Sequence, residues 1–198
     1  MSTPERDTRQ DIVDTAERFF REIGYQKTTV SDIAKSLRMS PANVYRFFDS
    51  KKAINEAVLA RYKGEQEAAL AAIASGPGTA TERLSEMLLA TNRINEARFK
   101  DQLRMNEMVC AAMEESWDAI LAHVARFDAL IEKVVAEGVA SGEFRKLDPT
   151  AATQCIRTAV IRFHHPLLMT QCEQMPGPSA EGLVAFILDG LKPVAPAA

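Results

Sequence analysis

The chain has 198 residues, of which 46% are hydrophobic and 26% are charged, and its formal net charge at pH 7 is −3. This length and composition are typical of a globular protein with one or two domains, and they exclude a disordered or fibrous chain. The opening residues lack the apolar run of a signal peptide, and no later segment is apolar for the length of a bilayer span, so we expect a cytoplasmic protein with no membrane partner.

The first predicted helix covers residues 7–23, where apolar residues from Ile12 to Ile23 recur at helical spacing. Thr8, followed three residues later by Asp11, resembles a capping box at the start of this helix. Gly24 supplies the left-handed residue that commonly ends a helix.

Two shorter helices are predicted next. Thr29 with Asp32 repeats the capping pattern and indicates the start of the second helix. The third helix begins at Pro41, because Ser40 can cap its free amides and Pro41 lacks an N–H at a position that needs none.

The third helix carries residues that stabilise a helix poorly, which indicates that they serve an outer surface. Val44 and Phe48 lie four residues apart and face the core of the first two helices. The residues that point away from this core are Pro41, Ala42, Asn43, Arg46 and Phe47. Joined by residues 38–40, the two short helices form a helix-turn-helix, whose second helix can enter the major groove of DNA.

The charge distribution favours the same function. Residues 1–63 carry 12 basic against 9 acidic side chains, whereas residues 64–198 carry 12 against 18. A basic N-terminal segment on an acidic body suits a polyanionic partner, although such a surface is often only solvated charge.

The rest of the chain also predicts helices, so we expect an all-α fold. One long helix covers residues 51–74, and others cover about 80–96, 99–114 and 116–141. Asp148 caps a helix that runs to about residue 172 with a kink at Pro166, and Pro178 with Ser179 starts the last helix. We expect residues 193–198 to be a disordered tail.

Residues 28–51, TTVSDIAKSLRMSPANVYRFFDSK, and the preceding helix that ends in EIGYQK resemble the DNA-binding domain of the TetR family of bacterial transcriptional regulators. The resemblance covers roughly the first 55 residues, and its marks are the Thr28-Thr29 pair, Ile33-Ala34, Ser40, the Val44-Tyr45 pair, Phe48 and Lys51. Two residues depart from the family pattern, Arg38 and Ala42, where glycine is common. Arg38 is strained if its position requires a positive φ.

The resemblance implies two domains ahead of the expected tail. A three-helix helix-turn-helix domain occupies residues 1–51, a helical effector-binding and dimerisation domain occupies residues 52–192, and the tail follows at 193–198. Relatives are mostly repressors that a small molecule releases from operator DNA.

The resemblance also implies roles for individual residues. Pro41, Ala42 and Asn43 reach base edges, and Arg46 pairs with guanine or phosphate. The remaining predicted DNA-binding residues, several of which match phosphate contacts, are Thr28, Thr29, Ser40, Tyr45, Phe47 and Lys51. Each also has a structural interpretation: a helix cap for the two threonines, packing for Tyr45 and solvated charge for Lys51.

The region after residue 90 contains candidates for an effector pocket. Soft or aromatic side chains there suit an apolar pocket, but such a group is more often plain core. Asn92, Arg104 and Glu107 are candidate polar anchors or solvent-facing residues. The predicted pocket residues are Asn92, Arg104, Met105, Met108, Met113, Trp117, Phe163 and His164.

The pair His164-His165 offers a polar contact to a ligand, or, with His123, a metal site. Neighbouring helical residues point about 100° apart, so we expect ordinary histidines, no metal and no cofactor. The cysteines Cys110, Cys155 and Cys172 are odd in number and lack paired spacing, so we expect reduced thiols.

Two apolar stripes near the C-terminus predict a dimer interface or, alternatively, part of the core of the chain itself. Their residues are Ile156, Val160, Phe163, Leu183, Val184, Ile187 and Leu191. The whole sequence therefore predicts a homodimeric repressor, bound to double-stranded operator DNA and released by a small apolar or amphipathic effector. A helical enzyme lacks a supporting nucleophile–base, carboxylate or metal pattern, and a protein-binding adaptor leaves the basic segment unexplained.

Overall fold

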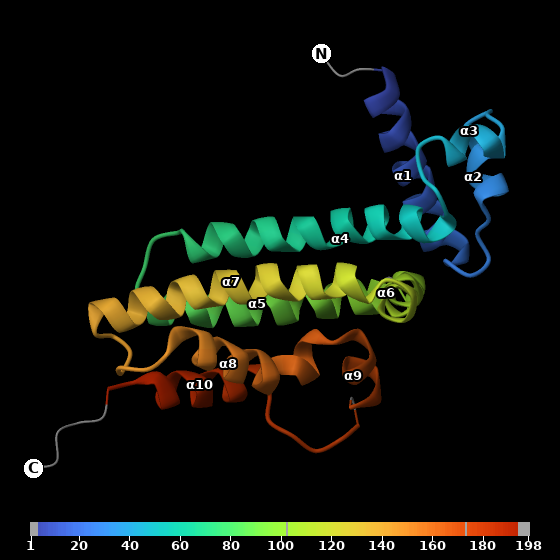
Figure 1. Ribbon diagram of the computed structural model, residues 1–198. Helices are drawn as coiled ribbons and strands as arrows, with labels where there is room; N and C mark the ends of the chain where they lie inside the picture. The colour runs from blue at the N-terminus through green and yellow to red at the C-terminus, as the bar shows by residue number, and fades with distance from the viewer. Residues whose placement is uncertain (1–3, 102, 173, 194–198) are drawn as a thin grey trace, which may run out of the picture. The chain divides into compact units, whose positions relative to one another are not determined.

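The computed structural model describes residues 4–101, 103–172 and 174–193, and these residues form helices joined by turns and loops, without a strand (Figure 1). The predicted all-α class is confirmed. Residues 194–198 of the predicted tail lie outside the described residues. The helices are α1 Pro4–Ile23, α2 Val30–Ser36, α3 Pro41–Tyr45, α4 Lys51–Ala74, α5 Ala80–Asp101, α6 Leu103–Glu115, α7 Trp117–Ser141, α8 Pro149–His164, α9 Pro166–Gln171 and α10 Ala180–Leu191.

The chain forms two compact units. The first unit comprises Met1–Gly64 and Arg98–His123, and the second comprises Glu65–Ala97 and Val124–Ala198. These units describe packing, so the functional boundary after residue 51 stays a prediction. Within the described residues no helix has the length and apolar character that crossing a membrane requires.

The first unit is built around α1, which packs against α2 and α6, while α2 packs against α3. Ile12 and Phe20 of α1, Ile33 of α2 and Val44 of α3 are all buried in its core. The ring of Phe20 meets the ring of Tyr25 edge to face, with their centroids 5.3 Å apart. These contacts hold α1 and the two short helices α2 and α3 together as one body.

Local signals explain most of the helix ends in this unit, but one prediction is wrong. Helix α1 begins at Pro4, so Thr8 and Asp11 lie within the helix and do not cap its start. Proline is well suited to the first helical position, and it extends the helix by one turn. Gly24, with φ 94°, ends α1 as predicted.

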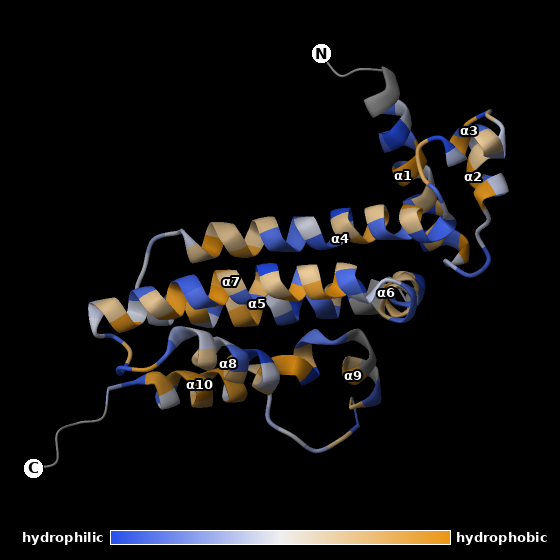
Figure 2. Cartoon of the chain, viewed as in Figure 1, coloured by the Kyte–Doolittle hydropathy of each residue, from blue (hydrophilic) through white to orange (hydrophobic). Residues whose placement is uncertain are grey.

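The second unit has its own hydrophobic core, contributed by α4, α5, α7, α8 and α10. Leu88, Ile131 and Val134 are among its buried residues, and α8 packs against α10. Figure 2 shows that α10 is hydrophobic along much of its length. Asp148 and Ser179 cap α8 and α10 as predicted, since their side chains accept hydrogen bonds from backbone N–H groups.

The predicted single helix up to residue 172 is wrong, because the chain breaks at His165. This residue has extended backbone angles, φ −94° and ψ 122°, and it separates α8 from α9. Proline disfavours helical angles at the preceding residue, so Pro166 ends one helix and starts the next instead of kinking a continuous one.

Candidate nucleic-acid interface

Helix α2 begins with a reciprocal cap. The Thr29 N–H donates to Asp32 Oδ2 at 2.9 Å, and the Asp32 N–H donates to Thr29 Oγ1 at 3.1 Å. Hydrogen bonds from the Thr29 hydroxyl and N–H hold the pKa of Asp32 below its usual value. The predicted capping box is confirmed, and it sets where the short helix begins.

Thr28 has a structural role in this conformation. Its side chain is buried, and its hydroxyl donates to the Gly24 carbonyl at 2.8 Å. Because this hydroxyl is buried and already paired, a phosphate contact by Thr28 would require another conformation, and it stays a prediction.

The turn between α2 and α3 contains an unusual backbone conformation at Arg38. Its φ is 55°, and among the described residues Arg38 is the one non-glycine residue with positive φ. The following N–H, of Met39, donates to the Ala34 carbonyl at 2.9 Å and closes the turn. The position therefore does require the left-handed region, where an L side chain is disfavoured.

Helix α3 presents one face to the core and another to solvent. Ser40 Oγ accepts a hydrogen bond from the Asn43 N–H at 3.2 Å, which confirms the predicted cap. Val44 and Phe48 are buried and anchor the segment. The residues that remain accessible, here called the outer face of α3, are Pro41, Ala42, Asn43, Tyr45 and Arg46.

The polar side chains of this outer face are only weakly held. Asn43 Nδ2 lies 3.9 Å from Met39 Sδ, and Arg46 Nη1 lies 3.5 Å from Asn43 Oδ1. Tyr45 has 49% of its surface exposed, while Phe47 is half-buried. Weak internal bonds leave Asn43 and Arg46 able to pair with another molecule instead.

Lys51, at the start of α4, is more than a solvated charge. Its ammonium lies 4.1 Å from the centroid of the Tyr25 ring and donates to the Gln26 carbonyl at 3.4 Å. Burial lowers the pKa of Lys51, and the nearby Glu115 carboxylate opposes this shift. Tyr25 in turn donates to Glu115 Oε2 at 2.8 Å.

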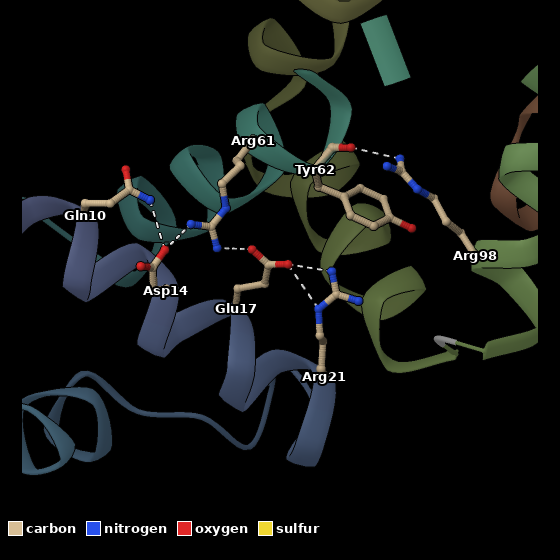
Figure 3. Close-up of polar contacts among 7 residues, drawn as sticks. All are labelled: Gln10, Asp14, Glu17, Arg21, Arg61, Tyr62 and Arg98. Atoms are coloured by element: carbon tan, nitrogen blue, oxygen red, sulfur yellow. Dashed lines mark hydrogen bonds and ion pairs between the residues drawn. The ribbon is translucent and has the colours of Figure 1, made fainter. Parts of the chain in front are cut away.

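An ion-pair network joins α1 to α4 within the first unit (Figure 3). Arg61 pairs with both Asp14 and Glu17, and Arg21 Nε donates to Glu17 Oε1 at 3.0 Å. Burial acts to raise the pKa of Glu17, but the hydrogen bonds from Arg21 and Arg61 outweigh it, so the pKa lies below its usual value. This network fixes the first half of α4 to the N-terminal helix.

Sequence reasoning missed this network because the partners of Arg61 lie 44 and 47 residues away. A second arginine also makes a contact distant in sequence, since Arg98 Nη1 donates to the backbone carbonyl of Tyr62, the residue after Arg61, at 2.8 Å. No spacing rule along the sequence reveals such distant pairs.

The predicted pocket residues divide between the two units. In the first unit Met105 and Met108 are buried core residues, Met113 is half-buried, Arg104 is exposed and Trp117 has 52% of its surface exposed. In the second unit Asn92 is buried, whereas Phe163 and His164 are half-buried. The structure therefore does not gather the full set in one unit, and a pocket formed by all of them stays a prediction.

The two C-terminal stripes contribute mainly to the core of the second unit. Ile156, Val160, Val184 and Leu191 are buried there, Leu183 and Ile187 pack against this core, and Phe163 is half-buried. The opposite sides of the same helices are accessible. Cys155 and Ala159 of α8, with Phe186 of α10, line a groove of about 410 Å³ in the surface of the unit.

Comparisons with known proteins agree with this architecture. The family described as "Bacterial regulatory proteins, tetR family" matches residues 12–58. The family described as "Tetracyclin repressor-like, C-terminal domain" matches residues 80–178.

Among curated proteins, the chain is similar to the biofilm operon icaADBC negative transcriptional regulator IcaR of Staphylococcus aureus (strain Newman), with 51% identity over 45 residues. This match covers 23% of the chain and 24% of that protein. The chain is also 35% identical over 71 residues to the transcriptional regulator UidR of Escherichia coli (strain K12), and this match covers 36% of the chain and 35% of that protein. The chain thus spans between a quarter and about a third of the length of these relatives.

Solved structures match over nearly the full length. A TetR/AcrR-family transcriptional regulator of Thermobifida fusca has a TM-score of 0.65 and 26% identity, covering 92% of this chain and 95% of that one. FadR of Bacillus subtilis, solved in complex with stearoyl-CoA, has a TM-score of 0.64 and 20% identity, covering 91% and 95%. The identity of the second structure is low enough that it supports the fold alone.

Proposed function

Because the chain belongs to the TetR family of bacterial regulatory proteins, we propose that it is a cytoplasmic transcriptional repressor that binds operator DNA as a homodimer and is released by a small-molecule effector. The observation that carries this proposal is the outer face of α3. Val44 and Phe48 hold the helix to the core while Asn43, Tyr45 and Arg46 stay accessible and weakly paired.

The proposed binding mode places α3 in the major groove. Asn43 and Arg46 read base edges, and Tyr45 and Lys51 contact phosphates that set the register. One helix as short as α3 contacts few base pairs, so specific binding needs two copies related by a two-fold axis on successive faces of the duplex.

The proposed regulation is a shift between two states of the dimer. An effector lowers the operator affinity if it binds better to a dimer whose α3 helices are spaced wrongly for the operator than to the dimer that fits the operator. The ratio of the effector's affinities for these two states limits the extent of release. The reciprocal linkage requires that operator DNA weakens effector binding by the same factor.

The direct test is selection of bound genomic fragments in vitro, followed by gel-shift titration of the selected site and of unrelated duplex DNA at several salt concentrations. We expect tight binding to fragments that share an inverted repeat, and weak, strongly salt-dependent binding to unrelated DNA. A wild-type protein that binds both DNAs equally weakly at low salt would contradict the proposal and favour a protein-binding adaptor.

A further inference from the structure

Two amide side chains are hydrogen-bonded to each other inside the second unit, and a third lies one turn away on α5. Gln66 of α4 donates from Nε2 to Asn95 Oδ1 of α5 at 3.5 Å, and Asn95 donates from Nδ2 to the backbone carbonyl of His164 of α8 at 3.3 Å. One turn earlier on α5, Asn92 donates from Nδ2 to Glu96 Oε1 at 3.1 Å. Only 3% of the surface of Gln66 and 8% of that of Asn92 are exposed.

The orientation of each amide follows from its partner. The His164 carbonyl can only accept, so Asn95 must turn its NH₂ group towards it and its oxygen towards Gln66. Gln66 must then offer its own NH₂ group, which leaves Oε1 on the other side. Glu96 Oε1 likewise accepts from the NH₂ group of Asn92, so Asn92 Oδ1 points away from Glu96.

Two buried hydrogen-bond acceptors remain. Within the described part of the chain, Gln66 Oε1 and Asn92 Oδ1 have no hydrogen-bond partner. Asn92 and Asn95 lie three residues apart on α5, hence on one helix face, and Asn95 contacts Gln66. A buried acceptor without a donor is uncommon in folded proteins and lowers stability, so each of the two oxygens indicates a place that a donor occupies in another state.

Thr91, next to Asn92 on α5, and His164, whose carbonyl accepts from Asn95, have contacts of their own. The Thr91 hydroxyl donates to the Met87 carbonyl at 2.8 Å, and the His164 ring meets the Phe127 ring edge to face with centroids 5.6 Å apart. Leu88 and Val160 belong to the hydrophobic core of the same unit. The two amide oxygens are thus polar points next to an apolar interior, the composition typical of a small-molecule site.

We propose that Gln66 Oε1 and Asn92 Oδ1 are the polar anchors for the effector, and that the effector carries a hydroxyl or amine donor on an apolar body. A ligand with a carboxylate or phosphate at this place would face two carbonyl oxygens and, through Asn92, the Glu96 carboxylate, which disfavour an anion. This inference rests on the proposed function, because it names the chemical class of the proposed effector.

An ordered water is the competing occupant, since a buried water can donate to an amide oxygen. The two occupants differ in what the Asn92→Leu variant does to the ligand-free protein. If Asn92 Oδ1 is unpaired without effector, the variant removes an unsatisfied buried acceptor and raises the melting temperature by about 2–4 °C. The lost partner of Glu96 costs little, because this exposed carboxylate can bind water instead. If a structural water satisfies Asn92 Oδ1, the same variant melts at a lower temperature.

The binding test uses three probes with one apolar body, 1-octanol, octylamine and octanoate, titrated into the full chain by calorimetry. We expect the alcohol or the amine to bind and octanoate not to bind. Gln66→Leu and Asn92→Leu should each weaken the binding of the donor probe about tenfold or more. Gln10→Leu, which alters an exposed glutamine of α1, is the matched control and should bind as the wild type does.

Octanoate binding as tight as that of the donor probes, absence of binding by both donor probes at millimolar concentration, or unchanged binding by both leucine variants would each overturn the proposal. Operator binding is measured separately on the same proteins without probe. If the wild type fails to bind DNA but binds donors through Gln66 and Asn92, the proposed function fails while the ligand chemistry holds.

Discussion

At the scale of single residues, the left-handed backbone of Arg38 makes a clear stability prediction. Glycine adopts φ 55° without the steric conflict of a Cβ atom, so Arg38→Gly should raise the free energy of unfolding by about 1 kcal/mol. Urea denaturation followed by circular dichroism measures this change. Lys35→Gly, at an exposed helical position of α2, is the control and should lower the free energy of unfolding by about 1 kcal/mol. A loss of stability in Arg38→Gly would show that the guanidinium contributes more than the strain removes.

Lys51 tests the phosphate contacts. We expect Lys51→Ala to weaken binding to all DNA sequences alike and to lower the slope of log affinity against log salt by roughly one unit, because one fewer phosphate is neutralised. Neighbouring Lys52 is exposed and lies 4.0 Å from Glu56, so Lys52→Ala is a matched control that should change the slope less. An unchanged slope in Lys51→Ala would restrict Lys51 to its contacts with Tyr25 and Gln26.

Asn43 tests base reading. An amide at the outer face of α3 can donate to and accept from one base edge, so Asn43→Ala should change the preferred base at one position per half-site and cost about 1–3 kcal/mol there. Gel shifts on a set of operator variants measure this preference. A uniform loss over all variants would instead assign Asn43 to the phosphate backbone.

At the scale of elements, a distant carboxylate helps to cap α5. Glu143 accepts hydrogen bonds from the N–H groups of Ala80 and Thr81, both at 3.1 Å, and these bonds hold its pKa below the ordinary value of 4.5. A group whose pKa is lowered by folding stabilises the protein above its unfolded pKa and loses that contribution as the pH falls through the folded pKa.

We therefore expect Glu143→Gln to reduce the free energy of unfolding at pH 7 by up to about 1 kcal/mol, because an ionised cap at a helix start is replaced by a neutral one. The difference between variant and wild type should shrink as the pH falls below 4.5 and the wild-type carboxyl becomes protonated. Urea titrations at pH 7 and in acid measure both values. A difference that does not change with pH would exclude the charge as its cause.

The elements that could be predicted from sequence are those with local signals. Ser40 with Pro41 and the Thr29 cap involve residues within one turn of each other, so their geometry follows from spacing. The start of α1 and the break at His165 depend on which of two competing local signals prevails. In each case a proline determined the helix boundary.

The parts of the candidate site that could not be predicted depend on tertiary contacts. The pairing of Arg61 with α1, the burial of Thr28 and the stacking of Lys51 on Tyr25 join segments that no periodicity relates. The same limit applies to the two C-terminal stripes. The sequence shows that their residues are apolar, but it does not show which of them face the core of the unit and which face outwards.

At the scale of the whole molecule, we propose that dimerisation uses the exposed sides of α8 and α10. Phe186 has 76% of its surface exposed and lines the apolar groove with Cys155 and Ala159. A large aromatic side chain in this position is typical of an interface between copies, since its burial removes much apolar area from water. Ile187 packs partly against the core of its own unit, so a substitution there would also affect folding. A substitution of Phe186 tests assembly with less effect on folding.

Phe186→Glu should therefore give a folded monomer with greatly reduced operator affinity, because each dimer would bury two unpaired charges. Sedimentation at micromolar concentration measures the assembly, and circular dichroism verifies the fold. Met175→Glu alters another exposed apolar side chain, outside the helices, and should remain dimeric. A Phe186→Glu variant that stays a tight dimer, or a monomeric wild type, would contradict this assignment.

The turn at Arg38 also has a genetic consequence. Every arginine codon becomes a glycine codon when its first base changes to guanine, so the strained backbone is a single point mutation away from relief. The same mutation removes a positive charge from the turn next to the outer face of α3. We therefore expect one mutational step at this codon to raise the stability of the protein and to lower its affinity for a polyanion.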